Sequence, residues 1–231
     1  MTNDLEPVRS GIGLDRRAFL RGLAGTGIAL AGVPLLPGLV KAQASTGTAQ
    51  KIANHFTRVK TMMGEFVQFG PRGEQTGGKF YIERPGRLRF NYEPPADFRV
   101  ISDGKSVALI NNKMKTADLY SLRNTPLKLI LDEEIDLSGN KVQGVREDPD
   151  LTTIHLADRN LFGKATIAMM FDPQSYDLRQ WTITDAQGKD TTVMIFNVQE
   201  GVKFDPSVFK IDYQRVNAMT QPNSAIRDQN R

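Results

Sequence analysis

The chain has 231 residues, of which 39% are hydrophobic, and its 30 basic and 26 acidic residues give a net charge of +4. This length is sufficient for a domain with a substantial apolar core. The absence of cysteine excludes disulfides, iron–sulfur clusters, a thiol nucleophile, cysteine-ligated zinc or copper and a lipid-modified N-terminal cysteine. The charges are nearly balanced and no basic stripe alternates with aromatic residues, so we do not expect nucleic-acid binding.

Residues 1–44 are predicted to form an export signal that is removed from the working protein. The pair Arg16-Arg17 precedes an uncharged apolar stretch, and an A-x-A cleavage pattern ends at Ala44. A twin arginine indicates the twin-arginine route, which exports folded chains across a bacterial inner membrane. Several glycines and two prolines within the apolar stretch argue against the alternative, a membrane anchor. The mature protein then begins at Ser45, with a net charge of about +2.

The residue spacing after the signal predicts one helix followed by a series of short strands. Apolar residues at Ile52, Phe56 and Val59 have helical spacing within the segment 49–60. From Gly64 onward, apolar and polar residues alternate with a period of two, and turn sequences such as G-P-R-G and D-G interrupt the alternation. Successive strands of this kind are expected to pair as antiparallel hairpins.

One predicted strand shows which face of the sheet turns inward. Leu88, Phe90 and Tyr92 point to one face, whereas Arg87 and Arg89 point to the other. We therefore expect the first face to line an apolar interior and the second to contact water.

The alternation ends in the middle of the chain and then resumes. Thr125 and Pro126 suit the start of a helix, and we expect one or two short helices over 125–138. Residues 205–210 are predicted to form a helical turn, and the polar tail from 217 is expected to be mobile. Between these segments, further strands are predicted over 140–147, 151–157, 164–171, 176–184 and 190–198.

These elements predict one α+β domain over residues 45–216, followed by the tail 217–231. A strongly curved antiparallel sheet forms an unclosed barrel, with the N-terminal helix and the mid-chain helices over its concave face. An apolar concave face needs a cover, and the mid-chain helices are the expected lid.

The sequence provides no catalytic constellation, so we do not predict an enzyme. His55 and His155 lack metal-ligand spacing and a G-x-S-x-G motif is absent, so neither a metal site nor a cofactor is expected. The acidic run 132–136 lacks the pattern of a calcium loop, and the glycines of 70–78 join two strands instead of preceding a helix.

Aromatic residues and methionines are the side chains of this sequence best suited to form a binding site. Many of the aromatic residues are predicted to face inward, and methionines such as Met169 and Met194 adapt to ligands of varied shape. A curved sheet with a helical cover could therefore enclose a cavity for an apolar ligand.

Several stretches, in this order and spacing, resemble the LolA family of periplasmic outer-membrane lipoprotein carriers. They are Gly64–Gln68, Gly78–Tyr92 with Pro95, Val100–Lys105, and Asn124–Leu127 with Ile130.

The resemblance implies an eleven-stranded unclosed barrel with a helical lid. It implies a monomeric periplasmic carrier, without cofactor, whose cavity holds the acyl chains of a lipoprotein. An inner-membrane transporter would release that lipoprotein to the carrier, and an outer-membrane receptor would accept it.

The resemblance also assigns roles to individual residues. Arg84 matches an arginine that hydrogen-bonds the lid backbone and holds the empty cavity shut. Leu88 and Phe90 match cavity positions where larger aromatics are common, a departure that affects ligand size. The expected cavity residues are Phe66, Phe80, Ile82, Leu88, Phe90, Tyr92, Met169 and Phe171, and the expected lid residues are Pro126, Leu127, Ile130 and Leu131.

Two alternatives stay open at the level of the sequence. One is a sensor of the same fold that binds lipids or lipoproteins without shuttling them. The other is a periplasmic hydrolase that depends on His155.

Overall fold

The computed structural model describes residues 47–137, 141–157 and 164–220, all of which belong to one compact unit, Val40–Arg231. The predicted export signal and residues 221–231 of the predicted tail lie outside the described residues. Within the described ranges, no helix is long and apolar enough to cross a membrane.

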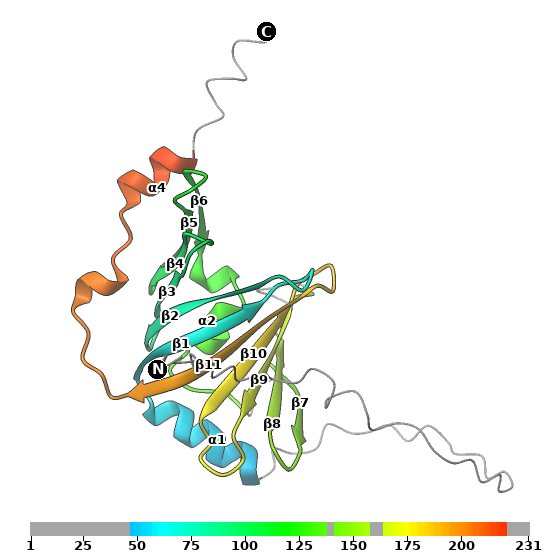
Figure 1. The fold of residues 1–231 in the computed structure, drawn as a ribbon. Helices are drawn as coiled ribbons and strands as arrows, with labels where there is room; N and C mark the ends of the chain where they lie inside the picture. The colour runs from blue at the N-terminus through cyan, green and yellow to red at the C-terminus, as the bar shows by residue number, and fades with distance from the viewer. Residues whose placement is uncertain (1–46, 138–140, 158–163, 221–231) are drawn as a thin grey trace, which may run out of the picture. The chain divides into compact units, whose positions relative to one another are not determined.

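The described strands form one eleven-stranded antiparallel sheet in the order β6-β5-β4-β3-β2-β1-β11-β10-β9-β8-β7 (Figure 1). The two ends of this order do not pair with each other, which confirms the predicted α+β class and the unclosed antiparallel sheet. The strands are β1 (Thr61–Phe69), β2 (Gln75–Glu83), β3 (Arg87–Tyr92), β4 (Phe98–Asp103), β5 (Ser106–Asn111), β6 (Thr116–Ser121), β7 (Val142–Glu147), β8 (Thr152–Ala157), β9 (Thr166–Phe171), β10 (Leu178–Thr184) and β11 (Asp190–Glu200).

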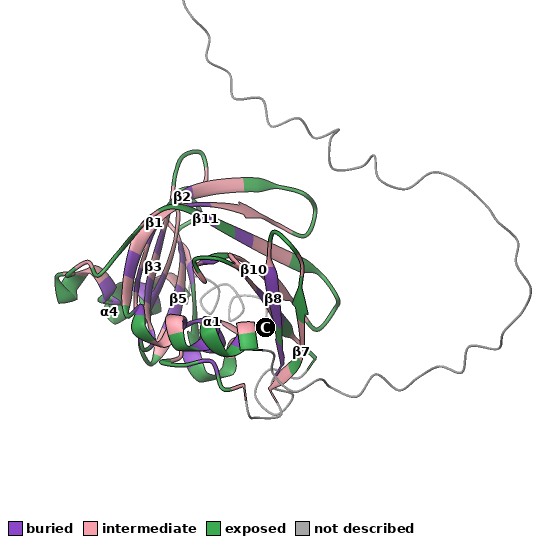
Figure 2. Ribbon diagram, turned by 90° about the horizontal axis from the view of Figure 1, so that it is seen from below, coloured by how far each residue is buried: buried purple, intermediate pink, exposed green. Residues whose placement is uncertain are grey.

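Two meanders make up this sheet, β1 to β6 and β7 to β11, and the pairing of β1 with β11 joins them. Phe66 of β1 lies opposite Ile195 of β11, and both side chains are buried. A β-bulge interrupts this ladder between Met63 and Glu65, where a strand bends more strongly. Figure 2 shows the strands curling around a common interior.

The alternation expected for β3 is confirmed. Leu88 and Phe90 are buried in the main core, whereas Arg87 and Arg89 are only half-buried. The main core fills the concave side of the sheet and includes Phe66, Phe80, Met169, Phe171 and Trp181.

The N-terminal helix α1 (Gly47–Arg58) packs against both meanders. Its buried residues Ala49, Ile52, Ala53 and Phe56 recur at helical spacing, so one face of the helix is apolar. The Phe56 ring meets Phe171 of β9 edge-on, with the ring centroids 6.2 Å apart.

The mid-chain helices are shorter than predicted. The structure has a 3-10 helix, η2 (Leu122–Asn124), and a single α-helical turn, α2 (Leu127–Ile130), and then irregular chain to 137. The acidic run 132–136 explains the early stop, because carboxylates are unfavourable beyond the C-terminal end of a helix.

The C-terminal segment covers the convex face of the first meander. The predicted turn is the 3-10 helix η3 (Pro206–Phe209), and an unpredicted helix, α4 (Tyr213–Thr220), follows it. The predicted tail therefore begins inside α4. Val216 and Ile211 join Ile101, Ala108, Ile110 and Ala117 in a second, smaller core.

Gly78 lies where two strands approach too closely for a side chain. A Cβ atom at this position would lie 2.0 Å from the backbone oxygen of Asn91 in β3. We expect Gly78→Ala to lower the free energy of unfolding by about 2–4 kcal/mol, measured by urea denaturation. The matched control is Gly144→Ala in β7, where a Cβ would meet nothing within 4 Å. Equal stabilities of the two variants would contradict this reading.

Candidate functional site

A cavity of about 360 Å³ opens on the concave side of the sheet. Its walls come from both meanders and from the mid-chain helix α2, and most of its lining is apolar. The lining residues are Gln68, Leu88, Phe90, Tyr92, Phe98, Val100, Leu109, Leu127, Trp181, Ile183, Thr191 and Val193.

Strand register explains how each wall forms. Phe90 lies opposite Val100, and Val100 lies opposite Leu109, so three neighbouring strands present one apolar row. On the other wall, Trp181 lies opposite Val193. The Phe90 and Trp181 rings meet edge-on, 6.1 Å between centroids, and this contact joins the two walls.

The polar residues of the lining are few, namely Gln68, Tyr92 and Thr191. The Tyr92 hydroxyl donates a 2.6 Å hydrogen bond to Oε1 of Gln68. Burial raises the pKa of Tyr92, so the phenol stays neutral at any physiological pH. The cavity therefore suits an uncharged, apolar ligand.

Helix α2 contributes one wall of the cavity through Leu127. Two backbone hydrogen bonds of 2.8 Å hold the ends of the α2 region, one from the Gly86 amide to the Leu131 carbonyl and one from the Leu122 amide to the Lys105 carbonyl. An ion pair between Lys128 and Asp132 closes the turn internally. Leu129 and Ile130 of this short element are also buried in the main core, which anchors it over the cavity.

The predicted cavity residues fall into two groups in the structure. Leu88, Phe90 and Tyr92 line the cavity. Phe66 packs behind Phe90 and Tyr92, with centroid distances of 4.5 and 4.9 Å, and Phe80 stacks on Phe90 at 5.9 Å.

The remaining predicted residues lie deeper. Ile82, Met169 and Phe171 are fully buried in the main core and do not belong to the lining. Of the predicted lid residues, Leu127 lines the cavity, Ile130 and Leu131 are buried in the same core, and Pro126 precedes α2.

Six apolar lining residues were not predicted, although their strands were. Each is an inward residue of a period-two strand, so extending the pattern of β3 to its neighbours would have identified them. They are Phe98, Val100, Leu109, Trp181, Ile183 and Val193.

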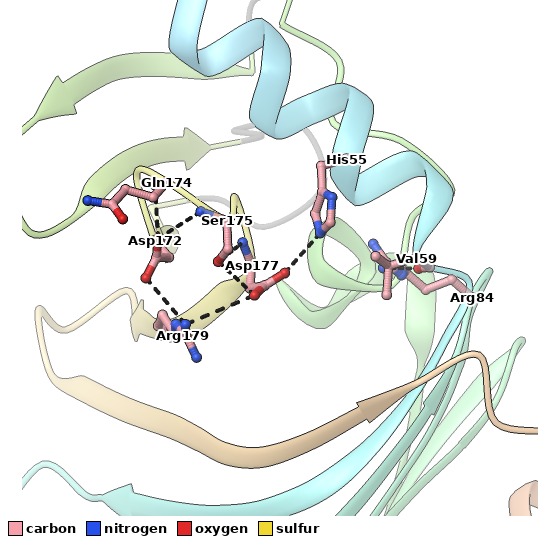
Figure 3. A network of polar contacts seen from close by, with 8 residues as sticks. All are labelled: His55, Val59, Arg84, Asp172, Gln174, Ser175, Asp177 and Arg179. Carbon is pink, nitrogen blue, oxygen red and sulfur yellow. Dashed lines mark hydrogen bonds and ion pairs between the residues drawn. The ribbon is translucent and has the colours of Figure 1, made fainter.

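Arg84, the predicted latch, is 5% exposed and lies against α1 (Figure 3). Its guanidinium lies 3.7 Å from the centroid of the Phe56 ring, and Nη2 donates a hydrogen bond to the Val59 carbonyl. Among the described residues, Nε and Nη1 have no hydrogen-bond partner. Burial lowers the pKa of Arg84 to about 10, partly opposed by Glu200, so the group remains charged at neutral pH.

The partner of Arg84 differs from the expected one. The sequence-based prediction placed its hydrogen bonds on the 125–138 segment, whereas the structure places one on Val59, just beyond the end of α1. The Phe56 ring attracts the guanidinium to its face, which directs the side chain toward α1.

His55 takes part in a polar cluster that the sequence did not predict. Its Nε2 lies 3.0 Å from Oδ1 of Asp177, and Glu200 brings a second carboxylate to the same place. The sequence spacing gave no signal, because His55 and Asp177 are 122 residues apart. The other histidine, His155, is exposed on β8.

Comparisons with known proteins agree on one family. Residues 57–212 match the LolA family, described as "Outer membrane lipoprotein carrier protein LolA". The outer-membrane lipoprotein carrier protein of Methylococcus capsulatus is 24% identical over 191 residues, which cover 77% of this chain and 89% of the relative. The corresponding protein of Pseudomonas putida is also 24% identical, with 76% and 88% coverage.

Among solved structures, several proteins have a low likeness to this chain. A LolA superfamily protein from Nitrosomonas europaea covers 73% of this chain and 100% of its own, at 9% identity and a TM-score of 0.42.

A larger side chain in the cavity should block an apolar ligand without loss of the fold. Leu109→Trp fills part of the cavity from β5, and we expect the affinity for a fluorescent fatty acid to fall at least about tenfold, measured by titration. The control is Leu119→Trp, at a 37% exposed position on the adjacent strand β6. Equal affinities of the two variants would show that the probe binds elsewhere.

Proposed function

The chain belongs to the LolA family of outer-membrane lipoprotein carrier proteins, and from this premise we propose that it carries the acyl chains of lipoproteins, in its concave cavity, from the inner to the outer membrane. The observation that carries the proposal is the apolar cavity between the two meanders. Each acyl methylene removed from water contributes about 0.8 kcal/mol to the free energy of binding. Such a cavity therefore allows a lipidated protein to cross an aqueous compartment.

The cavity is small for this task. Ligand pockets usually measure about 300–1,000 Å³, and the volume here, about 360 Å³, lies near the lower limit. A lipoprotein with several acyl chains therefore requires the lid to move. In the proposed cycle the described conformation corresponds to the closed state, and the ligand opens it by binding the open state more tightly.

Arg84 is proposed to stabilise the closed state from the α1 side. Its hydrogen bond to Val59 and its contact with the Phe56 ring connect the end of β2 to α1. A charged donor of this kind contributes about 1.5–3 kcal/mol, which lowers the apparent affinity for cargo and so permits release without an energy source.

The location and partners follow from the same proposal. Residues 1–44 serve as a twin-arginine export signal, and the protein works in the periplasm as a monomer. An inner-membrane transporter supplies the lipoprotein, and an outer-membrane receptor with a tighter cavity accepts it. Neither a sensor nor a hydrolase is favoured, because the family and the curated relatives are described as carriers.

A transfer assay tests the carrier role and the latch together. Protein loaded with a labelled lipoprotein is mixed with outer membranes, and the label that moves is measured. We expect the parent protein to transfer its cargo, and Arg84→Leu to load normally but to release at most about one tenth as fast. Arg89→Leu is the control, because Arg89 donates to the Val208 carbonyl on the convex side.

The outcomes separate the two claims. If the parent protein neither loads nor transfers, the carrier proposal fails. If the parent transfers and Arg84→Leu behaves as Arg89→Leu does, the latch alone is wrong.

Export gives an independent test of the signal. We expect replacement of Arg16 and Arg17 by lysine to leave the precursor in the cytoplasm, because the twin-arginine route depends on the arginine pair. Cell fractionation with N-terminal sequencing measures this. A normal amount of periplasmic protein from the double variant would exclude the twin-arginine route.

A further inference from the structure

Three potential metal ligands converge at one end of the sheet, outside the acyl-chain cavity. They are His55 of α1, Asp177 just before β10, and Glu200, the last residue of β11. One nitrogen or oxygen atom from each lies within 4.8 Å of the other two. The elements that carry them are distant in the sequence, so the fold itself assembles the group.

The separation of the His55 and Asp177 ligand atoms fits a small tetrahedral ion. Zinc binds histidine nitrogen and carboxylate oxygen at about 2.0–2.1 Å, which places neighbouring ligand atoms about 3.3 Å apart. The distance from Nε2 of His55 to Oδ1 of Asp177 is 3.0 Å, so this pair needs almost no movement. The side chains of His55 and Asp177 are 22% and 34% exposed, which leaves a path for the ion and a fourth position for water.

Asp177 is held in place by its own neighbours (Figure 3). The Ser175 hydroxyl donates a 2.7 Å hydrogen bond to Oδ2, which leaves Oδ1 directed at His55. Asp172 fixes the loop by accepting 2.9 Å bonds from the amides of Gln174 and Ser175. Such outer contacts are what orient the ligands of established metal sites.

The charges in the cluster are not balanced for Glu200. Its exposed carboxylate has no hydrogen-bond partner in the described part of the chain, and one of its oxygens lies within 4.8 Å of the Asp177 carboxylate. A divalent cation between the carboxylates would remove their mutual repulsion. Two cations compete for these carboxylates: Arg179, whose Nη2 lies 4.0 Å from Oδ2 of Asp177, and Arg84, which acts on Glu200 from beyond ion-pair distance.

We propose that His55, Asp177 and Glu200 form a zinc site that ties α1 to the end of β11 and to the β9–β10 loop. Imidazole together with two carboxylates is an established zinc ligand set, with the fourth position left to water. The ion would hold α1 next to the point where Arg84 already contacts it. The proposal adds a property that the carrier role does not require.

Zinc titration of the purified protein tests the site. The protein carries no histidine tag, is stripped with EDTA, and competes for Zn²⁺ with a chromophoric chelator. We expect one Zn²⁺ per chain and a higher melting temperature with zinc. His55→Ala and Glu200→Gln should each weaken binding more than about tenfold. His155→Ala, which removes the other histidine, should bind as the parent does.

The outcomes decide the proposal in either direction. No stoichiometric binding, or equal binding by the parent and Glu200→Gln, would overturn it. If His55→Ala does not fold, Glu200→Gln provides the same test, because Glu200 makes no hydrogen bond that the change would break within the described ranges. X-ray absorption of the zinc-loaded protein should show nitrogen and oxygen ligands at about 2.0–2.1 Å. Transfer of lipoprotein is a separate measurement, so failure of the zinc site leaves the carrier proposal intact.

Discussion

The pairing of β1 with β11 is the contact on which the rest of the described sheet depends. Every other strand pair joins neighbours in the sequence, whereas this one joins the first strand to the last. It turns two separate meanders into one curved sheet, so that the row through Phe90 faces the row through Trp181. It also places Glu200 opposite Met62 at the end of the sheet that α1 covers. Both the cavity and the proposed zinc site therefore depend on one ladder of hydrogen bonds.

The buried Arg84 illustrates how this architecture balances stability against opening. A charge inside a core loses hydration, and here only part of its donor capacity is met by Val59. An apolar side chain of similar size would pack there without the desolvation cost of a buried charge. A buried arginine with unmet donors suits the proposed latch, because a contact that has to break and re-form must not be too stable.

The sequence indicated where the strands lie more clearly than it indicated which elements pack next to one another. The alternation through Leu88, Phe90 and Tyr92 predicted an inward face, because the period of a strand fixes which side each residue occupies. The edge strand β6 was not predicted, since four of its six residues are exposed and it has no apolar alternation. Helix α4 was not predicted for the same reason, because Val216 is its one buried residue.

The site was predictable only in part, for a related physical reason. The residues of one strand share a cavity wall by geometry, so Leu88 and Phe90 could be assigned together. The partner of Arg84 depends on which element packs over Phe56, and the His55–Asp177 contact depends on a fold that closes 122 residues of chain. Periodicity describes a segment, whereas these contacts are decided by the packing of segments against one another.

The same long-range pairing has a consequence for the synthesis of the protein. About 120 residues separate the end of β1 from the start of β11, and a ribosome adds about 5–20 residues per second. During synthesis, β1 therefore remains without its pairing partner β11 for at least several seconds. A chain that emerges in this order exposes an unpaired strand to aggregation during synthesis. Cytoplasmic chaperones can shield the unpaired strand during this time. An export route that accepts only folded chains would keep the protein in the cytoplasm until β11 has paired with β1.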